Sequence, residues 1–216
     1  MKKTSLIVFL AMFLILCSAV VAQDEDEEKW RNFEVGINVG LTMPSNIDWY
    51  DSLEAKNGAN YGLFGGYYFN DKFCLGSYFT YAQMSPDETT VFSIADQKYK
   101  MYRLGFYGKY AFAGESNFEP YVKVSAGINF AKFATWVGPA RTLLREISYD
   151  PAFSGAAYLG LSYFTSDYGA IYLEVSYHLD KLKNTPAEYG NVEFPFPEDI
   201  KYLEVNAGVV VFFGPE

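Results

Sequence analysis

Eight segments of the chain alternate between apolar residues and small or polar ones, and this period of two constrains the fold more than any other feature. Successive side chains of a β-strand point to opposite faces, so each segment predicts a strand with one apolar face. In the first segment, Phe33, Val35, Ile37, Val39 and Leu41 alternate with Glu34, Gly36, Asn38, Gly40 and Thr42. The predicted strands cover residues 33–42, 61–70, 73–84, 102–112, 122–130, 154–163, 171–180 and 202–213.

The connections between the predicted strands alternate strictly between long and short. The long ones cover residues 44–60, 85–98, 135–151 and 181–199, and the short ones cover residues 70–72, 113–119 and 165–168. Short turns at one end and long loops at the other are typical of up-and-down barrels, and an even number of strands puts both termini at the short-turn end. Strands of about 9–11 residues also suit a tilted membrane crossing.

The character of the two faces indicates which one points outward. In a soluble barrel the apolar face lines the interior and the charges lie outside. Here the apolar face carries large aliphatic and aromatic residues, while the other carries mainly Gly, Ser, Asn and Tyr with a few charges. Small residues suit a narrow interior and bulky ones suit lipid. We therefore predict an all-β chain that forms an eight-stranded antiparallel up-and-down transmembrane β-barrel, with short periplasmic turns and four long extracellular loops.

Aromatic residues make up 19% of the chain and gather where the predicted strands end. Near the short turns lie Phe69, Phe73, Phe112, Phe118, Tyr121, Tyr163, Tyr168 and Phe213, and toward the long loops lie Tyr81, Tyr99, Tyr177 and Tyr202. Two such belts are expected where a barrel meets the two membrane interfaces.

The first 22 residues predict a secretory signal peptide. Lys2 and Lys3 precede an uninterrupted apolar run over residues 6–16, and Ala22 ends a cleavage site of small and branched residues. A transmembrane anchor would need about 20 apolar residues. We expect export through the Sec pathway to the outer membrane, with cleavage after Ala22. The domains that follow are an acidic periplasmic tail (23–32), the barrel (33–213) and a C-terminal tail (214–216).

Charge, cysteine and histidine exclude several classes of function. The chain has 17 basic and 26 acidic residues, and two of the basic ones leave with the signal peptide. An acidic exported chain is a poor candidate for nucleic acid. After cleavage Cys74 is the one cysteine and His178 the one histidine, which argues against an intrachain disulfide and against cysteine-rich or histidine-rich metal sites. We predict no cofactor and no metal.

The charged residues of the inward faces form two groups once strand direction sets their height. Glu34, Lys109, Lys123 and Glu174 fall in the periplasmic half, and Arg103, His178, Asp180 and Glu204 fall in the extracellular half. Each group mixes signs, because an unpaired charge in a narrow interior is costly. Two interpretations remain open: a plug of structural ion pairs that fills the barrel, and a small gated pore whose ion pairs rearrange.

One strand face carries three residues at intervals of two that suggest the nucleophile, base and acid of a hydrolytic triad: Ser176, His178 and Asp180. That spacing separates neighbours by about 6.6 Å along the strand, whereas a triad needs hydrogen bonds of roughly 3 Å. Tilting of the side chains along the strand would bring one neighbouring pair within hydrogen-bond distance but not both. Lipid A deacylases of the outer membrane carry a His-x-Ser pair, and this chain reads Ser-x-His. We therefore predict that the protein is not an enzyme.

The signal peptide, the eight alternating strands and the last strand, residues 205–213, resemble the small outer-membrane barrels typified by the OmpA membrane domain, OmpX and OmpW. The resemblance implies contact with outer-membrane lipid and recognition of the C-terminal strand by the barrel-assembly machinery. Members usually end on an aromatic residue, whereas here three residues follow Phe213.

Function is expected on the long loops, since loops on a rigid scaffold commonly carry it. The interaction candidates are Trp49, Tyr50, Trp136, Leu143 and Leu144. A second interpretation, which the resemblance to OmpX implies, is equally open: strands continue beyond the bilayer, and their upper parts include Phe92, Ile94, Trp136 and Val137. The leading prediction is a filled barrel that acts in adhesion or envelope integrity through an extracellular or envelope partner. The alternatives are an OmpW-like channel for small hydrophobic solutes, which needs a gap in the wall or an apolar upper lumen, and a lipid-modifying hydrolase.

Overall fold

The computed structural model describes residues 31–46, 55–86, 95–112, 117–137, 142–181 and 199–214. The strands in these ranges are β1 (Phe33–Asn46), β2 (Ala55–Tyr68), β3 (Phe73–Pro86), β4 (Ala95–Ala111), β5 (Phe118–Val137), β6 (Thr142–Ser148), β7 (Ala152–Ser166), β8 (Gly169–Lys181) and β9 (Asp199–Phe213). None of the described residues belongs to a helix long and apolar enough to cross a membrane.

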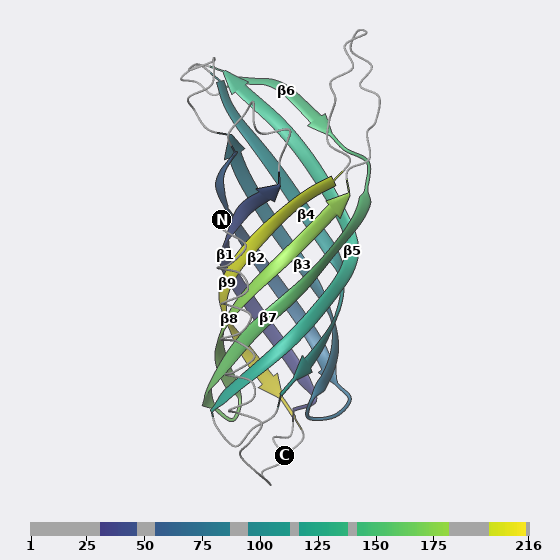
Figure 1. The fold of residues 1–216 in the computed structure, drawn as a ribbon, viewed down its shortest axis with the longest axis vertical. Coiled ribbons are helices and arrows are strands. Elements are labelled where there is room, and N and C mark those ends of the chain that lie inside the picture. The colour runs from purple at the N-terminus through teal and green to yellow at the C-terminus, as the bar shows by residue number, and fades with distance from the viewer. Residues whose placement is uncertain are drawn as a thin grey trace.

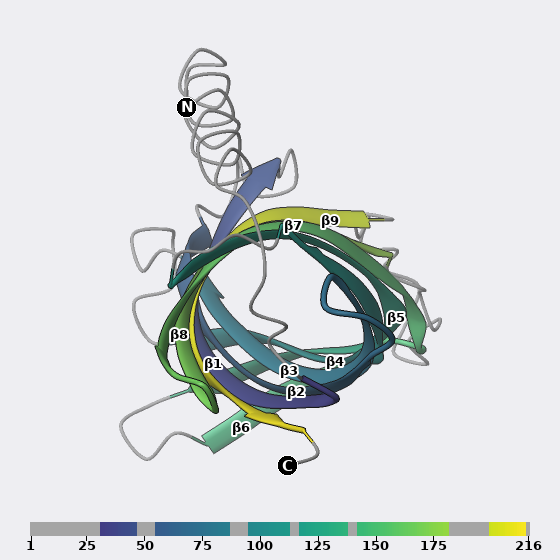
Figure 2. The same ribbon diagram turned by 90° about the horizontal axis from the view of Figure 1, so that it is seen from below.

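Eight of these strands close into an antiparallel barrel. The order β4-β3-β2-β1-β9-β8-β7-β5 is completed by pairing of β4 with β5, and the first and last strands of the chain lie side by side. The strands are strongly tilted (Figure 1), and the view along the barrel shows a complete ring (Figure 2). The predicted fold class is therefore confirmed.

The two faces of the wall differ as the alternation predicts. Outward residues such as Ile37, Leu104 and Val124 are 59%, 55% and 63% exposed, although they are large and apolar. Inward residues are buried, and they include charged residues of several strands, such as Glu34, Arg103 and Glu204. Three aromatic residues predicted for the outer belts, Tyr121, Tyr99 and Tyr202, point inward and are buried, so that assignment was wrong for them.

On the extracellular side the strands extend further than the segments with clear alternation, as the second interpretation of Trp136 and Val137 expects, whereas Phe92 and Ile94 lie outside the described residues. The connection predicted over 135–151 contains the end of β5 and the whole of β6, and the connections predicted over 44–60 and 85–98 contain the upper ends of β1, β2, β3 and β4. Residues Ala95–Lys98 of β4 pair with β5, and β5 pairs with β6, so a three-stranded sheet rises above the other strands (Figure 1). Above the rim both sheet faces meet similar surroundings, so the alternation that marks a strand fades.

Among the described residues, the pairing of β1 with β2 stops before either strand reaches its upper end. Their pairing ends at Thr42 and Gly58. Beyond this point β1 continues against β9, with Pro44 opposite Tyr202, while β2 continues against β3. The two strands therefore separate, and in Figure 2 the end of β1 lies outside the ring of strands.

Inward glycines and inward aromatic residues pack as cross-strand pairs. The directly opposed pairs are Gly36 with Phe64, Gly76 with Tyr107, Gly160 with Tyr121 and Gly208 with Tyr172. A Cβ placed on any of these glycines would lie 2.0–2.7 Å from an atom of the paired ring. Each of these glycines has no side chain, and the aromatic ring of the paired strand packs into the space that this leaves.

Candidate functional site

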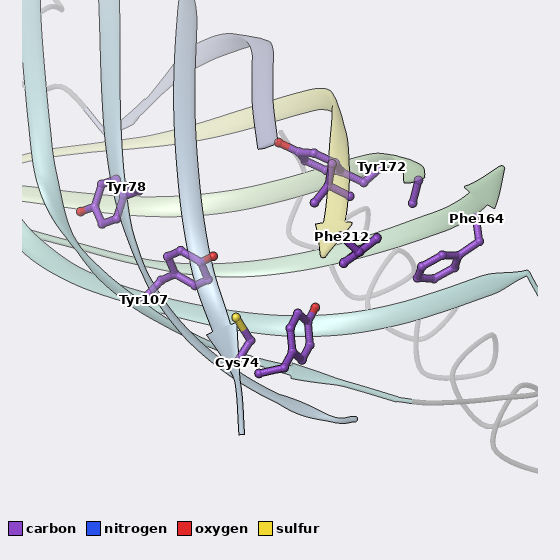
Figure 3. Packing of buried hydrophobic residues seen from close by; sticks show 9 residues of the cluster. Cys74, Tyr78, Tyr107, Phe164, Tyr172 and Phe212 are labelled. Carbon is purple, nitrogen blue, oxygen red and sulfur yellow. The ribbon is translucent and has the colours of Figure 1, made fainter. Parts of the chain in front are cut away.

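The candidate site is the lumen, where side chains from all eight barrel strands meet. Its apolar part in the lower half contains residues such as Cys74, Tyr107, Phe164 and Phe212, which converge from different strands (Figure 3). The charged residues predicted to point inward lie among these side chains and above them. They form one group in the lower half of the lumen and one in the upper half.

Glu34 is the centre of the lower group. It is 1% exposed and forms an ion pair with Lys109. The hydroxyls of Tyr107 and Tyr68 donate hydrogen bonds to its carboxylate at 2.7 and 2.9 Å, and the Cys74 Sγ lies 3.6 Å from Oε1. A buried carboxylate with this many donors is fixed in place, because each donor replaces a lost water.

Lys123 and Glu174 form the second ion pair of the lower half, with 2.5 Å between Nζ and Oε2. Tyr121 donates to the same carboxylate oxygen at 3.0 Å. The Lys123 ammonium also lies 4.1 Å from the ring centroid of Tyr158, a cation–π contact. The four residues predicted for the periplasmic half thus lie there as two ion pairs.

The upper group centres on Arg103, which is 1% exposed. Its guanidinium donates to Glu204 Oε1 at 2.6 Å and lies 2.6 Å from His178 Nδ1. Thr42 donates to the same Glu204 oxygen at 3.0 Å. Asp180 is also buried at this end, but its partner is the hydroxyl of Tyr202 and not Arg103.

Ser176 and His178 are closer than their backbone spacing implies, since Oγ lies 2.9 Å from Nε2. The second gap, between His178 and Asp180, is not bridged. Arg103 is a donor only, so His178 Nδ1 must accept, and the ring hydrogen sits on Nε2. Nε2 therefore donates toward Ser176 or Glu204, which lies 3.2 Å away, and is not free to take a proton from the serine. This geometry does not make a hydrolytic triad.

A further ion pair, between Arg31 and Glu119, closes the periplasmic end, and neither residue stood out in the sequence. Arg31 precedes the first alternating segment, and Glu119 falls at the edge of a predicted turn. Both are buried, and the guanidinium makes two hydrogen bonds to the carboxylate, one of them 2.9 Å long. Burial alone would lower the pKa of Arg31, but the hydrogen bond and charge of Glu119 outweigh it and raise that pKa.

The upper end of the lumen is apolar, which the sequence did not indicate. Two methionines and several aromatic side chains form this buried cluster: Ala82, Met84, Tyr99, Met101, Ala131, Tyr149, Ile200 and Tyr202. Met84 Cγ lies beside Gly58, and Tyr202 is paired with Pro44. The cluster therefore reaches the point where β1 and β2 separate.

Little space is left between the two charged groups. A cavity of about 20 Å³ lies between them, bounded by residues that include Lys123, Glu174 and Glu204, and a second of about 10 Å³ lies beside Glu34 and Lys109. Spaces of this size hold roughly one water molecule each. Among the described residues no group of three or more His, Cys, Asp or Glu side chains could hold a metal ion.

The residues predicted for interaction lie either in β5 and β6 above the barrel rim or outside the described residues. Trp136 belongs to β5, where it pairs with Leu143 of β6, and Leu144 lies at the register shift that follows. These three residues are therefore in the raised sheet and not in an irregular loop. Trp49 and Tyr50 lie outside the described residues.

Comparison with known proteins agrees with this architecture. The sequence model of a family described as "Outer membrane protein beta-barrel domain" matches residues 9–213. Neisserial surface protein A (NspA) has a similar structure, with a TM-score of 0.58 and 18% identity over 84% of this chain and 97% of that one. OprG from Pseudomonas aeruginosa gives a TM-score of 0.52 and 17% identity over 89% and 100%. At this identity the likeness shows a shared fold. No curated protein matches the sequence.

Proposed function

The chain belongs to the outer membrane protein β-barrel family, and from this premise we propose that it acts in adhesion or envelope integrity through contacts made above the barrel rim. The observation that carries the proposal is the raised sheet of β4, β5 and β6. Within the described part of the chain β6 pairs with β5 alone, so its other edge is open. An open strand edge offers unpaired backbone groups to an extended segment of an extracellular or envelope partner.

The filled lumen supports a contact role over transport of water-soluble molecules. Three ion pairs and the buried tyrosines occupy the centre, and the cavities between them are of water size. We infer that the inward charges are a structural plug. Planar-bilayer recordings of the purified barrel should give no large, steady conductance, and a persistent porin-like step would contradict the plug.

The surface role is tested by removing the raised sheet without disturbing the barrel. Residues 135–148 would be replaced by a short Gly-Ser turn, and folding would be checked by heat-modifiable migration on a gel. Cells that display the parent barrel should adhere to a host-cell layer or withstand detergent better than cells that display the shortened one. Equal behaviour of the two, with both barrels folded, would contradict the proposal.

Residues 1–22 are proposed to direct Sec export and to be removed after Ala22, and β9 is proposed to be the strand that the barrel-assembly machinery recognises. The first assignment is supported by the order of basic residues, apolar run and cleavage site in the N-terminal segment, and the second by the aromatic end of β9 at Phe213. N-terminal sequencing of the protein from outer membranes should begin at Gln23.

A second candidate function is lateral passage of small hydrophobic molecules from the upper lumen into the membrane. It is favoured by the separation of β1 from β2 beside the apolar cluster of Met84 and Tyr202. Methionine side chains are flexible and adapt to apolar ligands. A disulfide between Met43→Cys and Asn57→Cys would hold the strands together and should reduce uptake of a hydrophobic dye into vesicles. A disulfide between Val39→Cys and Tyr61→Cys, where β1 and β2 already pair, is the control. Equal uptake in the two would exclude this route.

A further inference from the structure

The first residue that the structure describes, Arg31, contributes its side chain to the lumen. Asn32 already belongs to the wall, since its amide donates to Phe213 and its carbonyl accepts from Tyr68. Arg31, one residue earlier, is 5% exposed, so its side chain lies inside the short-turn end of the barrel. The residue that leads into the first strand is thus also part of the interior.

The surroundings of Arg31 form a site fitted to a guanidinium. Glu119, on β5, binds it with both carboxylate oxygens. Three aromatic rings face the same group, with centroids 5.3 Å (Tyr68), 4.7 Å (Phe164) and 5.0 Å (Phe212) from Cζ. A paired carboxylate and aromatic faces are the two kinds of group that bind a planar cation best, and here both are buried.

Tyr68 connects this site with the ion pair above it. Its ring makes cation–π contacts with both the Arg31 guanidinium and the Lys109 ammonium, whose Nζ is 5.1 Å from the ring centroid. Its hydroxyl donates to Glu34, the partner of Lys109. Loss of Arg31 would therefore remove one contact of the ring that holds the lower ion pair in place.

We propose that Arg31 is a latch that closes the periplasmic mouth of the barrel: Glu119 and the three rings hold it, and its release opens the lower lumen as far as Cys74. The bond joins the N-terminal entry to a strand 88 residues away in the sequence, across the mouth. This inference concerns the lower end of the barrel and does not depend on the surface role.

Cys74 is a built-in reporter for the latch. It is fully buried, pairs with Tyr68 across β2 and β3, and contacts Glu34. In barrels inserted into vesicles, N-ethylmaleimide should label Cys74 in Arg31→Ala at least about tenfold faster than in the parent, because the local opening becomes more frequent. Peptide mass spectrometry assigns the label to Cys74. Lys72→Ala is the matched control, since it removes an exposed basic residue from the turn at the same end.

A second variant separates opening from general loss of structure. Glu119→Gln keeps the shape of the carboxylate but removes its charge, and it should also speed labelling, by less than Arg31→Ala. Both variants should keep heat-modifiable migration. The latch is overturned if either folded variant protects Cys74 as well as the parent and Lys72→Ala do. It is also overturned if neither variant folds, because a latch that opens leaves the barrel standing.

Discussion

Arg103 lies fully buried in the lumen and joins β4 to side chains of two other strands. It binds Glu204 of β9 and His178 of β8, and its guanidinium lies 5.4 Å from the ring centroid of Tyr202. Arg103→Met would leave the buried Glu204 carboxylate without its main cation. Breaking one side of a buried ion pair costs about 3–5 kcal/mol. Urea-dependent unfolding of the barrel in vesicles should show a loss of this size.

The matched comparison is the double variant Arg103→Met with Glu204→Leu, which removes both charges. Because the Glu204 carboxylate is then absent and cannot be left unpaired, it should be more stable than Arg103→Met alone. Lys72→Met, at an exposed turn, should change stability by less than about 0.5 kcal/mol. A double variant weaker than the single one would show that Arg103 stabilises the barrel by packing and not through its charge.

Sequence reasoning at this scale could place the inward charges but not pair them. Alternation is a local property, so it assigned Arg103 and Glu204 to the inner face and to the same half of the barrel. Whether Arg103 meets Glu204 or Asp180 depends on side-chain packing across the lumen, which no local pattern records. Arg31 could not be found because it precedes the first alternating segment, and Glu119 could not because it lies beside a turn.

At the scale of the strands, the glycine–aromatic pairs show how neighbouring strands fit. Gly160 of β7 lies opposite Tyr121 of β5, and a Cβ on this glycine would lie 2.0 Å from the ring. Gly160→Ala must therefore displace Tyr121 and weaken its hydrogen bond to Glu174. Overpacking of this kind costs about 1–3 kcal/mol, which the urea midpoint would report.

The outward glycines Gly65 and Gly108 provide the control for this prediction. A Cβ on either would meet its nearest neighbour only at 3.4 Å, so alanine should be tolerated at both. If Gly65→Ala and Gly160→Ala destabilise the barrel equally, the cost comes from the strand backbone and not from the ring. The sequence predicted small residues inside a narrow barrel, but the register that pairs four of the glycines with rings emerged only from the structure.

Strand ends were less predictable than strand centres, and the reason is physical. Between the rims, lipid on one side and a packed lumen on the other impose strict alternation. The eight predicted segments fall on the eight barrel strands, with small overruns past the ends of β2 and β4 at Tyr68 and Ala111. Above the rim this contrast is lost. The sequence therefore left two interpretations open for the upper part of β5 and did not indicate β6 as a strand, although backbone pairing continues through Val137 opposite Thr142.

At the scale of the whole molecule, the outward apolar residues define the band that contacts lipid. Ile37 lies midway along the outward face of β1, between Leu63 and Val209 on the neighbouring strands. Phe69 lies at the turn between β2 and β3 and is equally exposed, at 60% against 59%. The two positions therefore differ in their height along the barrel and not in exposure, which makes them a test of immersion.

An arginine should cost more at Ile37 than at Phe69. On the lipid face of a barrel, arginine costs about 2–4 kcal/mol near the bilayer midplane and about 0–1 kcal/mol near the interfaces. Unfolding of Ile37→Arg and Phe69→Arg in lipid vesicles measures this difference, and the same pair in detergent, where depth is poorly defined, should differ less. Equal costs in vesicles would mean that the band is not centred on Ile37. A large cost at Phe69 as well would mean that the short turns, and with them the Arg31 latch, lie deeper than the membrane interface.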